Sequence, residues 1–558
     1  MRSSILLGLV FLVACGDSPP AIRTELVLRN ATIYTGDSLA PTATAVAVQG
    51  GKIVYVGDEA GVAAYIDKAT ETIDLAGRFV YPGFVDAHAH FTGIGQREQR
   101  LNLEGTSTKD AFLAKVEAAV AKAKPGEWVT GRGWIETFWS PPVFPTRHDL
   151  DRIAPNNPVL LTRADGHASI VNSAALKLAG VTGRSVVPAG GAINLDPDGE
   201  PTGMLIDAAQ GLVRGLVPEP TEEELERALV LASERSVRLG WTQLHDAHGS
   251  WAEVARMRKL YGEGRIQVRL YKTISGPSRE ADSLIALGPQ PPEFDDHFTL
   301  RDLKLVMDGA LGSRGAALLE PYSDDPTTTG LITTDTIAAL DMATRALRAG
   351  VQVEIHAIGD RGNRASLDLF EAAFKVVPPA ERKVAEPRWR IEHAQIIAPV
   401  DLPRFKSLGL IASMQASHAI GDLFFVPRRI GVSRTAGAYA WHSMLAMGVP
   451  VAGGTDAPVE RGEPMIEFYA AVARKSLDGK DGPGWHPEER VSRAEALLMF
   501  TWFPAFASFQ EDRSGRIATG MRGDFTVLDR DIMTIPEAEI LKTTNVLTVI
   551  GGKVVFRK

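Results

Sequence analysis

Cysteine is nearly absent: the chain has one among 558 residues, at position 15. A single thiol excludes a disulfide framework within the chain and any metal site built from several cysteines. Basic residues are not in excess either, because 60 Lys and Arg face 68 Asp and Glu and give a net charge of −8. This balance argues against a nucleic-acid partner, which usually requires a basic surface. With 45% apolar and 23% charged residues, the composition is that of a globular chain and excludes a disordered or coiled-coil protein.

Long apolar runs are also scarce, and the one run that could serve as a membrane or targeting segment lies at the start of the chain. Arg2 precedes an apolar segment at 5–13, which ends in Leu12-Val13-Ala14-Cys15. The segment is too short for a transmembrane helix but suits the core of a signal peptide. We therefore expect a lipoprotein signal peptide at 1–14, lipidation of Cys15, and a tether at 15–23. An ordinary secretory signal with an incidental cysteine is the alternative.

This reading predicts an exported protein of the cell envelope, on the periplasmic or surface side. Its contact with the membrane would be the lipid on Cys15 alone. Gly16, rather than Asp, follows the cysteine and favours the outer membrane if the host has two membranes.

Both ends of the chain, at 24–81 and 510–558, consist of short strand-like runs separated by glycine and aspartate. Such runs indicate antiparallel strands. Neither end has enough strands for a sandwich by itself, so we expect both to build one composite β-sandwich. Two separate β appendages are the alternative.

Between them, at 82–509, strand-like runs alternate with helical stretches such as 221–239, 335–349 and 365–376. This order predicts parallel α/β architecture. Eight strands would close a (β/α)8 barrel, and the candidates are 83–88, 242–246, 267–272, 303–307, 352–356, 389–393, 410–415 and 449–454.

A long insertion, at about 95–220, separates the first two candidate strands. It has strand-like runs at 127–131 and 159–162 and a turn-rich stretch at 189–203. We expect it to cover the barrel mouth. Its aromatic residues Trp134, Phe138 and Trp139 would either form an apolar wall of the substrate pocket or the core of the insertion.

Several candidate strands end in a residue that can bind a metal. His88 and His90 are two apart on one extended segment, so their side chains share a face. His356, His393 and Asp456 end or follow three later strands. Strand ends converge at a barrel mouth, where four imidazoles and a carboxylate would suit zinc or a similar divalent ion.

Lys304 stands out because the alternation in 303–308 turns it, with Asp308, toward the barrel interior. An unpaired buried ammonium carries a large desolvation cost. A neutral lysine could react with CO₂ and form a carbamate that bridges two metal ions. A salt bridge to an acid such as Asp308 is the alternative.

An ordered series of motifs adds to these features. The chain resembles the amidohydrolase superfamily, most closely its YtcJ-like branch of family-3 amidohydrolases, which includes N-substituted formamide deformylases. The resemblance covers nearly all of the mature chain and rests on 81–90, 131–134, 145–151, 165–168, 308–314, 391–395 and 454–458.

The resemblance implies a distorted (β/α)8 barrel with a composite β-sandwich from both termini. It implies that His88 and His90 hold a first ion, while Lys304, as a carbamate, bridges to a second ion on His356 and His393. Asp456 would contact the first ion and the attacking hydroxide. One or two ions are expected, with zinc as the default; iron, manganese or cobalt could use the same ligands.

The predicted activity is hydrolysis of an amide, N-acyl or N-formyl C–N bond in a small molecule. A metal-bound hydroxide would attack while Asp456 serves as general base and then acid. We expect His167, His245 and Arg314 to bind substrate, and a homodimer is possible. The alternatives are a deaminase, a cyclic-amide, ester or phosphotriester hydrolase, a non-catalytic metal-binding surface lipoprotein, and a metal-free isomerase.

Overall fold

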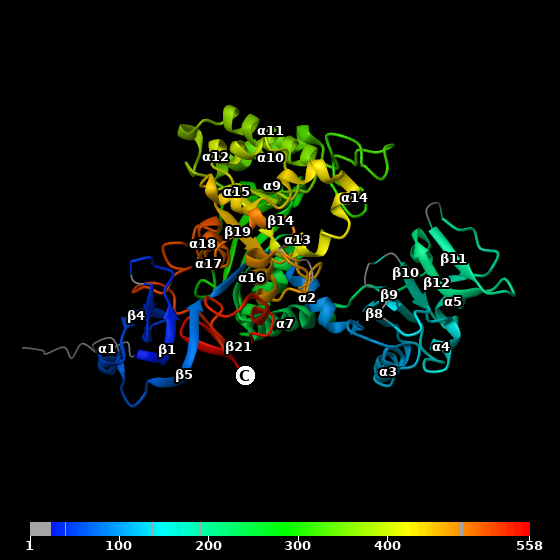
Figure 1. The fold of residues 1–558 in the computed structure, drawn as a ribbon, viewed down its shortest axis with the longest axis horizontal. Helices are drawn as coiled ribbons and strands as arrows, with labels where there is room; N and C mark the ends of the chain where they lie inside the picture. Colours follow the sequence, from blue (N-terminus) through cyan, green and yellow to red (C-terminus); the bar gives the residue numbers. More distant parts are fainter. Residues whose placement is uncertain are drawn as a thin grey trace, which may run out of the picture.

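The structure is a computed structural model that describes residues 24–39, 41–136, 139–163, 166, 168–188, 191–479, 482 and 484–558. The predicted signal peptide, Cys15, the tether, Phe138 and His167 lie outside the described residues. Within the described ranges, no helix combines the length and the apolar character that crossing a membrane requires. Figure 1 shows a β-rich lobe at the left, a central barrel, and the insertion as a separate lobe at the right.

The central sheet has eight strands in the order β19-β18-β17-β16-β15-β14-β13-β6. Each neighbouring pair is parallel. The backbone N–H groups of Thr455 and Asp456 donate to the carbonyl of His88, at 3.2 and 2.7 Å, and so join the last strand to the first. The predicted barrel is confirmed. Its strands are β6 (Phe84–Ala89), β13 (Trp241–Asp246), β14 (Arg269–Ser275), β15 (Phe298–Val306), β16 (Gln352–Ala357), β17 (Arg390–His393), β18 (Ile411–Gln415) and β19 (Val451–Gly454).

Five of the outer helices, α7, α8, α9, α10 and α17, begin at a polar residue whose side chain caps the first turn. Thr221 and Glu224 form a reciprocal capping box at the start of α7, and Asp335 accepts two backbone N–H groups at the start of α10. Helix α11 begins five residues earlier than predicted, because its first turn is polar and lacks the apolar period. The outer helices are α7 (Glu222–Leu239), α8 (Trp251–Gly262), α9 (Arg279–Leu287), α10 (Thr336–Ala349), α11 (Asp360–Val376), α12 (Leu402–Leu408), α16 (Pro464–Ala473), α17 (Arg493–Met499) and α18 (Trp502–Ala507).

The two ends of the chain meet in one sheet of order β22-β21-β20-β5-β1-β3-β4, with β2 paired to β1. The joining pair is antiparallel and brings Phe525, near the C-terminus, opposite Pro82. Two separate appendages are therefore ruled out. The strands are β1 (Thr24–Tyr34), β2 (Thr42–Ala43), β3 (Ala45–Gln49), β4 (Lys52–Gly57), β5 (Glu71–Pro82), β20 (Phe525–Leu528), β21 (Asn545–Ile550) and β22 (Lys553–Arg557).

The insertion has a six-stranded sheet of its own, ordered β11-β12-β10-β9-β8-β7. Trp134 and Trp139 are buried with Phe112 in its core, so they do not line the barrel mouth. The stretch predicted as turn-rich contains the hairpin β11–β12. The elements are β7 (Leu101–Asn102), α3 (Lys109–Val120), β8 (Val129–Trp134), α4 (Arg147–Asp151), β9 (Val159–Arg163), β10 (Ala168–Val171), α5 (Ser173–Ala179), β11 (Gly191–Leu195) and β12 (Pro201–Asp207).

In Figure 1 the insertion forms a lobe of its own, joined to the barrel through helix α2 (Phe91–Gln99). Helix α2 packs against α7 in the barrel's outer layer. Gly95 approaches the backbone of Ala228 so closely that no side chain would fit there. The chain leaves the barrel after α2 and returns beside it, where Gln99 donates a hydrogen bond to the carbonyl of Glu224, and the separate sheet begins at β7.

Candidate metal centre

The barrel brings the predicted metal ligands to one end. His88 lies in β6, His90 precedes α2, Lys304 lies in β15, His356 in β16, His393 ends β17, and Asp456 follows β19. Five different strands thus contribute, as the convergence of parallel strand ends requires.

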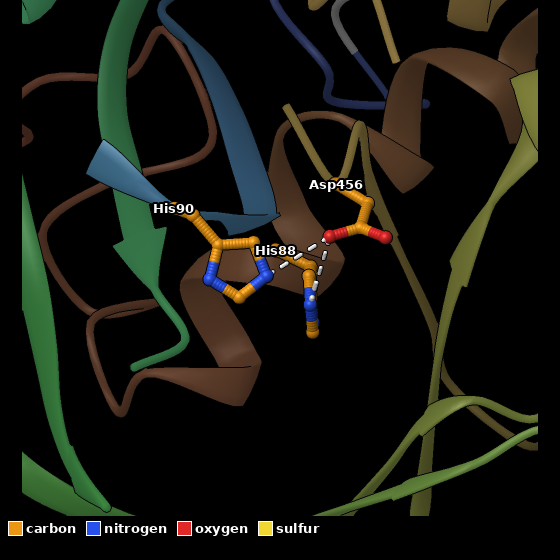
Figure 2. A group of neighbouring side chains, drawn as sticks. All are labelled: His88, His90 and Asp456. Carbon is orange, nitrogen blue, oxygen red and sulfur yellow. Dashed lines mark ion pairs between the residues drawn. The ribbon is translucent and has the colours of Figure 1, made fainter. Parts of the chain in front are cut away.

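His88, His90 and Asp456 form a first compact group (Figure 2). The Nε2 atom of His90 is 3.1 Å from Oδ1 of Asp456, and Nε2 of His88 is 3.5 Å from the same oxygen. Each residue offers one ligand atom, and these atoms lie within 4.8 Å of one another. One cation could therefore contact all three.

A second group contains His393, His418 and again Asp456. The Nε2 atom of His418 is 3.6 Å from Oδ2 of Asp456, and its ring stacks on His393 with centroids 5.8 Å apart. Sequence reasoning missed His418 because it lies in helix α13 (Ala416–Asp422) rather than at a strand end. Its position three residues after β18 was the available signal.

Several buried ligand nitrogens lack a hydrogen-bond partner among the described residues: Nε2 of His88, His356 and His418. Burial of an unpaired polar atom costs free energy. A divalent cation bound by these nitrogens, together with the carboxylate of Asp456, would satisfy them, and zinc or another borderline ion suits such a mixed set. The residues therefore fit a metal centre.

The protonation of these groups also suits metal binding. Burial and the charge of Lys304 lower the pKa of His88 well below its ordinary value, and they lower that of His356 to about 3. Neutral imidazoles are the form that binds a cation. Burial by itself would raise the pKa of Asp456. The hydrogen bond from His90 and the charges of the neighbouring histidines outweigh it, so this pKa falls below its usual range.

Lys304 is buried, and its charge contributes to the low pKa values of His88, His356 and His393. The acid that faces it is Glu354, with Oε1 3.8 Å from Nζ, and not Asp308. Lys304 and Glu354 are register partners on β15 and β16, whereas Asp308 lies beyond the end of β15. Asp308 instead accepts backbone N–H groups at 317, 358 and 359.

Polar side chains that contact Nδ1 of the candidate ligands His88 and His393 hold the two imidazole rings in place. Glu392 contacts Nδ1 of His88, and Oε1 of Gln415 is 2.8 Å from Nδ1 of His393. Glu392 in turn lies 3.1 Å from the guanidinium of Arg390, which also pairs with Asp302 and Glu354. Such outer partners fix ring orientation and leave Nε2 for the metal. The sequence did not single out these partners.

Of the residues predicted to bind substrate, the structure describes His245 and Arg314. His245 is buried in β13, where its Nδ1 is 2.9 Å from Arg390 and its ring contacts Tyr271. Burial and the charge of Arg390 lower its pKa well below the ordinary value. Arg314 lies on the loop after β15, with 35% of its side chain exposed and an ion pair of 3.1 Å to Asp324.

A (β/α)8 barrel with histidines and a carboxylate at its strand ends defines a class, the metal-dependent hydrolases of this fold. A family model described as "Amidohydrolase family" matches residues 71–556. The chain belongs to the amidohydrolase family, which confirms the resemblance seen in the sequence.

Three curated relatives match over most of their length. The chain is 34% identical to "Protein LONG AFTER FAR-RED 3" of Arabidopsis thaliana, over 97% of this chain and 93% of that protein. It is 33% identical to "Putative amidohydrolase YtcJ" of Bacillus subtilis (88% and 92% covered) and 29% to "N-substituted formamide deformylase" of Arthrobacter pascens (95% and 97% covered).

Among solved structures, an uncharacterized metal-dependent hydrolase from Pyrococcus furiosus matches with a TM-score of 0.71 and 28% identity. The match covers 91% of this chain and 100% of that one. Together with the histidine and aspartate groups, these findings support a metal-dependent amidohydrolase.

Proposed function

We propose that the protein hydrolyses the C–N bond of an amide, N-acyl or N-formyl amine, with Asp456 as general base and then general acid. The observation that carries this proposal is the position of Asp456. Its Oδ1 faces His88 and His90, its Oδ2 faces His418, and its lowered pKa keeps it in the carboxylate form. A curated relative acts, by its name, on N-substituted formamides.

The metal centre would use the groups described above. His88, His90 and Asp456 would hold one divalent ion, and His356 and His393 would hold a second, with Lys304 as a carbamate ligand shared by both. Zinc is the default for these ligands. A bound divalent ion lowers the pKa of water from 15.7 to about 7.

The carboxylate of Asp456 orients the attacking water and accepts its proton while a C–O bond forms at the carbonyl carbon. The same carboxyl group then gives that proton to the leaving nitrogen as the C–N bond breaks. The products are a carboxylic acid and an amine, so no other reactant is needed. Glu392 and Gln415 keep His88 and His393 in the orientation that this geometry requires.

The test combines metal analysis with an amide screen. Purified protein is assayed for transition metals by mass spectrometry and for amine release from N-formyl and N-acyl amines, with lactams and esters alongside. We expect amine release that a chelator abolishes and added metal restores. Release that persists without metal would overturn the metal-dependent mechanism. Full metal content with no turnover of any substrate would favour the non-catalytic metal-binding protein.

A further inference from the structure

A cavity of about 530 Å³ lies next to the candidate metal centre. Helix α13, the segment after β19, the start of α16 and residues 476–478 surround it. Its apolar walls are Ile420, Phe424, Ile466 and Leu477, and Ser417 and Glu460 add polar groups. Among the described residues that line it, none belongs to the insertion.

One imidazole connects the cavity to the catalytic acid. The Nε2 atom of His418 is 3.6 Å from Oδ2 of Asp456 and 3.8 Å from Oε1 of Glu460. The two oxygens of Asp456 therefore face different surroundings. Oδ1 faces His88 and His90, while Oδ2 faces His418 and the cavity beyond it.

We propose that this cavity receives the amine-side substituent of the substrate, an apolar group on the leaving nitrogen. The inference rests on the proposed amide hydrolysis. A group that protonates the leaving nitrogen must come within about 2.6–3.2 Å of it. His88 and His90, the ligands proposed for the first ion, take the Oδ1 side, so the nitrogen approaches the Oδ2 side, where its substituent enters the cavity.

The walls define the chemistry of this substituent. Phe424 and Leu477 are 64% and 44% exposed, and an aromatic or branched aliphatic group would cover them. The carboxylate of Glu460 attracts the released ammonium and repels a second carboxylate. Arg461 also lines the cavity, but its guanidinium pairs with Glu463 at 2.8 Å. We therefore assign simple apolar amines as the leaving group and exclude N-acyl amino acids.

The first test measures amine binding to the metal-loaded full chain by ligand-observed NMR titration, with benzylamine and benzyl alcohol as probes. A Cβ on the exposed Gly421 would lie 3.5 Å from Oε1 of Glu460, so Gly421→Trp fills the cavity. We expect it to weaken benzylamine binding by about tenfold or more. Gly211→Trp, at an exposed helical glycine of the insertion with open space around it, is the matched control and should bind as wild type does.

Glu460→Gln tests whether the negative charge of Glu460 favours binding of the amine. The preference for benzylamine over benzyl alcohol should fall by about tenfold, the value of a charge-assisted hydrogen bond. The amine site is overturned if Gly421→Trp binds benzylamine like wild type, because direct coordination of the amine by the metal would then explain its binding.

The second test separates this inference from the proposed function. In Gly421→Trp, the ratio of kcat/KM for N-benzylformamide to that for N-methylformamide should fall about tenfold. The ratio of N-benzylformamide to N-benzylacetamide should stay unchanged. Chelator-sensitive hydrolysis with an unchanged first ratio overturns the inference and leaves the function standing. Cavity-dependent benzylamine binding without hydrolysis of any amide supports the amine site and overturns the reaction.

Discussion

The carboxylate of Glu392 contacts Nδ1 of His88 across the interior of the barrel, and both side chains are almost completely buried. This contact leaves Nε2 of His88 directed at Asp456. Loss of such an outer partner typically lowers metal affinity by about 10–100-fold. We expect Glu392→Gln to do so, as measured by competition with a chromophoric chelator.

Glu489→Gln is the control for that experiment, since Glu489 is also buried but binds Ser443 outside the centre. Equal metal affinities in the two variants would show that Glu392 has no part in positioning His88.

The proton-transfer role of Asp456 predicts that activity and metal content separate. Asp456→Asn keeps an oxygen ligand but loses the basic carboxylate, so turnover should fall by about 10²–10⁴-fold while bound metal stays nearly constant. Amine release and metal analysis on the same sample check this. Asp341→Asn, at an exposed ion pair on α10, is the control and should be fully active. Undiminished turnover in the Asp456 variant would show that another group moves the proton.

Lys304 should carry a carboxylated Nζ in the metal-loaded protein. Carbon-13 NMR of protein prepared with labelled bicarbonate should show a carbamate signal that is missing in Lys304→Met. The variant should also bind less of the second ion, because the bridging anion is lost. A protein with two bound ions and no carbamate signal would instead indicate that Lys304 remains an ammonium paired with Glu354.

The junction between the terminal sheet and the barrel depends on a buried ion pair. Arg269 of β14 donates two hydrogen bonds to Asp524, at 2.8 and 3.0 Å. Burial would raise the pKa of Asp524, but the charge and hydrogen bonds of Arg269 lower it overall. Removal of one partner of a buried pair costs about 3–5 kcal/mol. Asp524→Asn should therefore lower the calorimetric Tm at pH 7.

The contribution of Asp524 to the free energy of unfolding depends on pH, and its lowered pKa fixes the direction of this dependence. Because the folded-state pKa of Asp524 is depressed, its contribution is complete above the unfolded value of about 3.9 and is lost as the pH falls through the folded value. The Tm difference between wild type and Asp524→Asn should thus be constant from pH 7 to 5 and shrink below about pH 4. A difference that grows with acid would contradict this assignment.

We also propose that the protein is exported and anchored through a lipid on Cys15. In a bacterial host with lipoprotein processing, metabolic labelling with a palmitate analogue should modify the wild type and not Cys15→Ser. No other residue can substitute, since the chain has one cysteine. Fractionation should move the variant from the membrane to a soluble exported pool. Labelling of the serine variant would point to a different anchor.

Much of the barrel could be predicted from the sequence, because its strands, its helices and the pair of histidines on β6 follow from local periodicity. His88 and His90 share a face since side chains alternate along an extended segment. The helical stretch predicted at 221–239 matches α7, whose start the capping box of Thr221 and Glu224 fixes within one turn of helix. The eight strands were predicted from apolar runs that are buried on both faces.

Other features could not be predicted from the sequence, because they depend on which segments become neighbours when the barrel closes. Glu354 rather than Asp308 faces Lys304 because strand register, not distance along the chain, decides which side chains are neighbours. His418 reaches Asp456 from a helix, and no periodicity marks such an approach. His245 lies near the end of its strand, as His356 and His393 do, but its Nδ1 contacts the buried guanidinium of Arg390.

The strand-like and helical runs, their order along the chain and the residue types that can bind a metal follow from sequence patterns only a few residues long. The tertiary structure alone decided which ring meets which acid, where the cavity opens, and which strands of the two ends pair. These depend on contacts between segments hundreds of residues apart, whose geometry follows from barrel closure and packing.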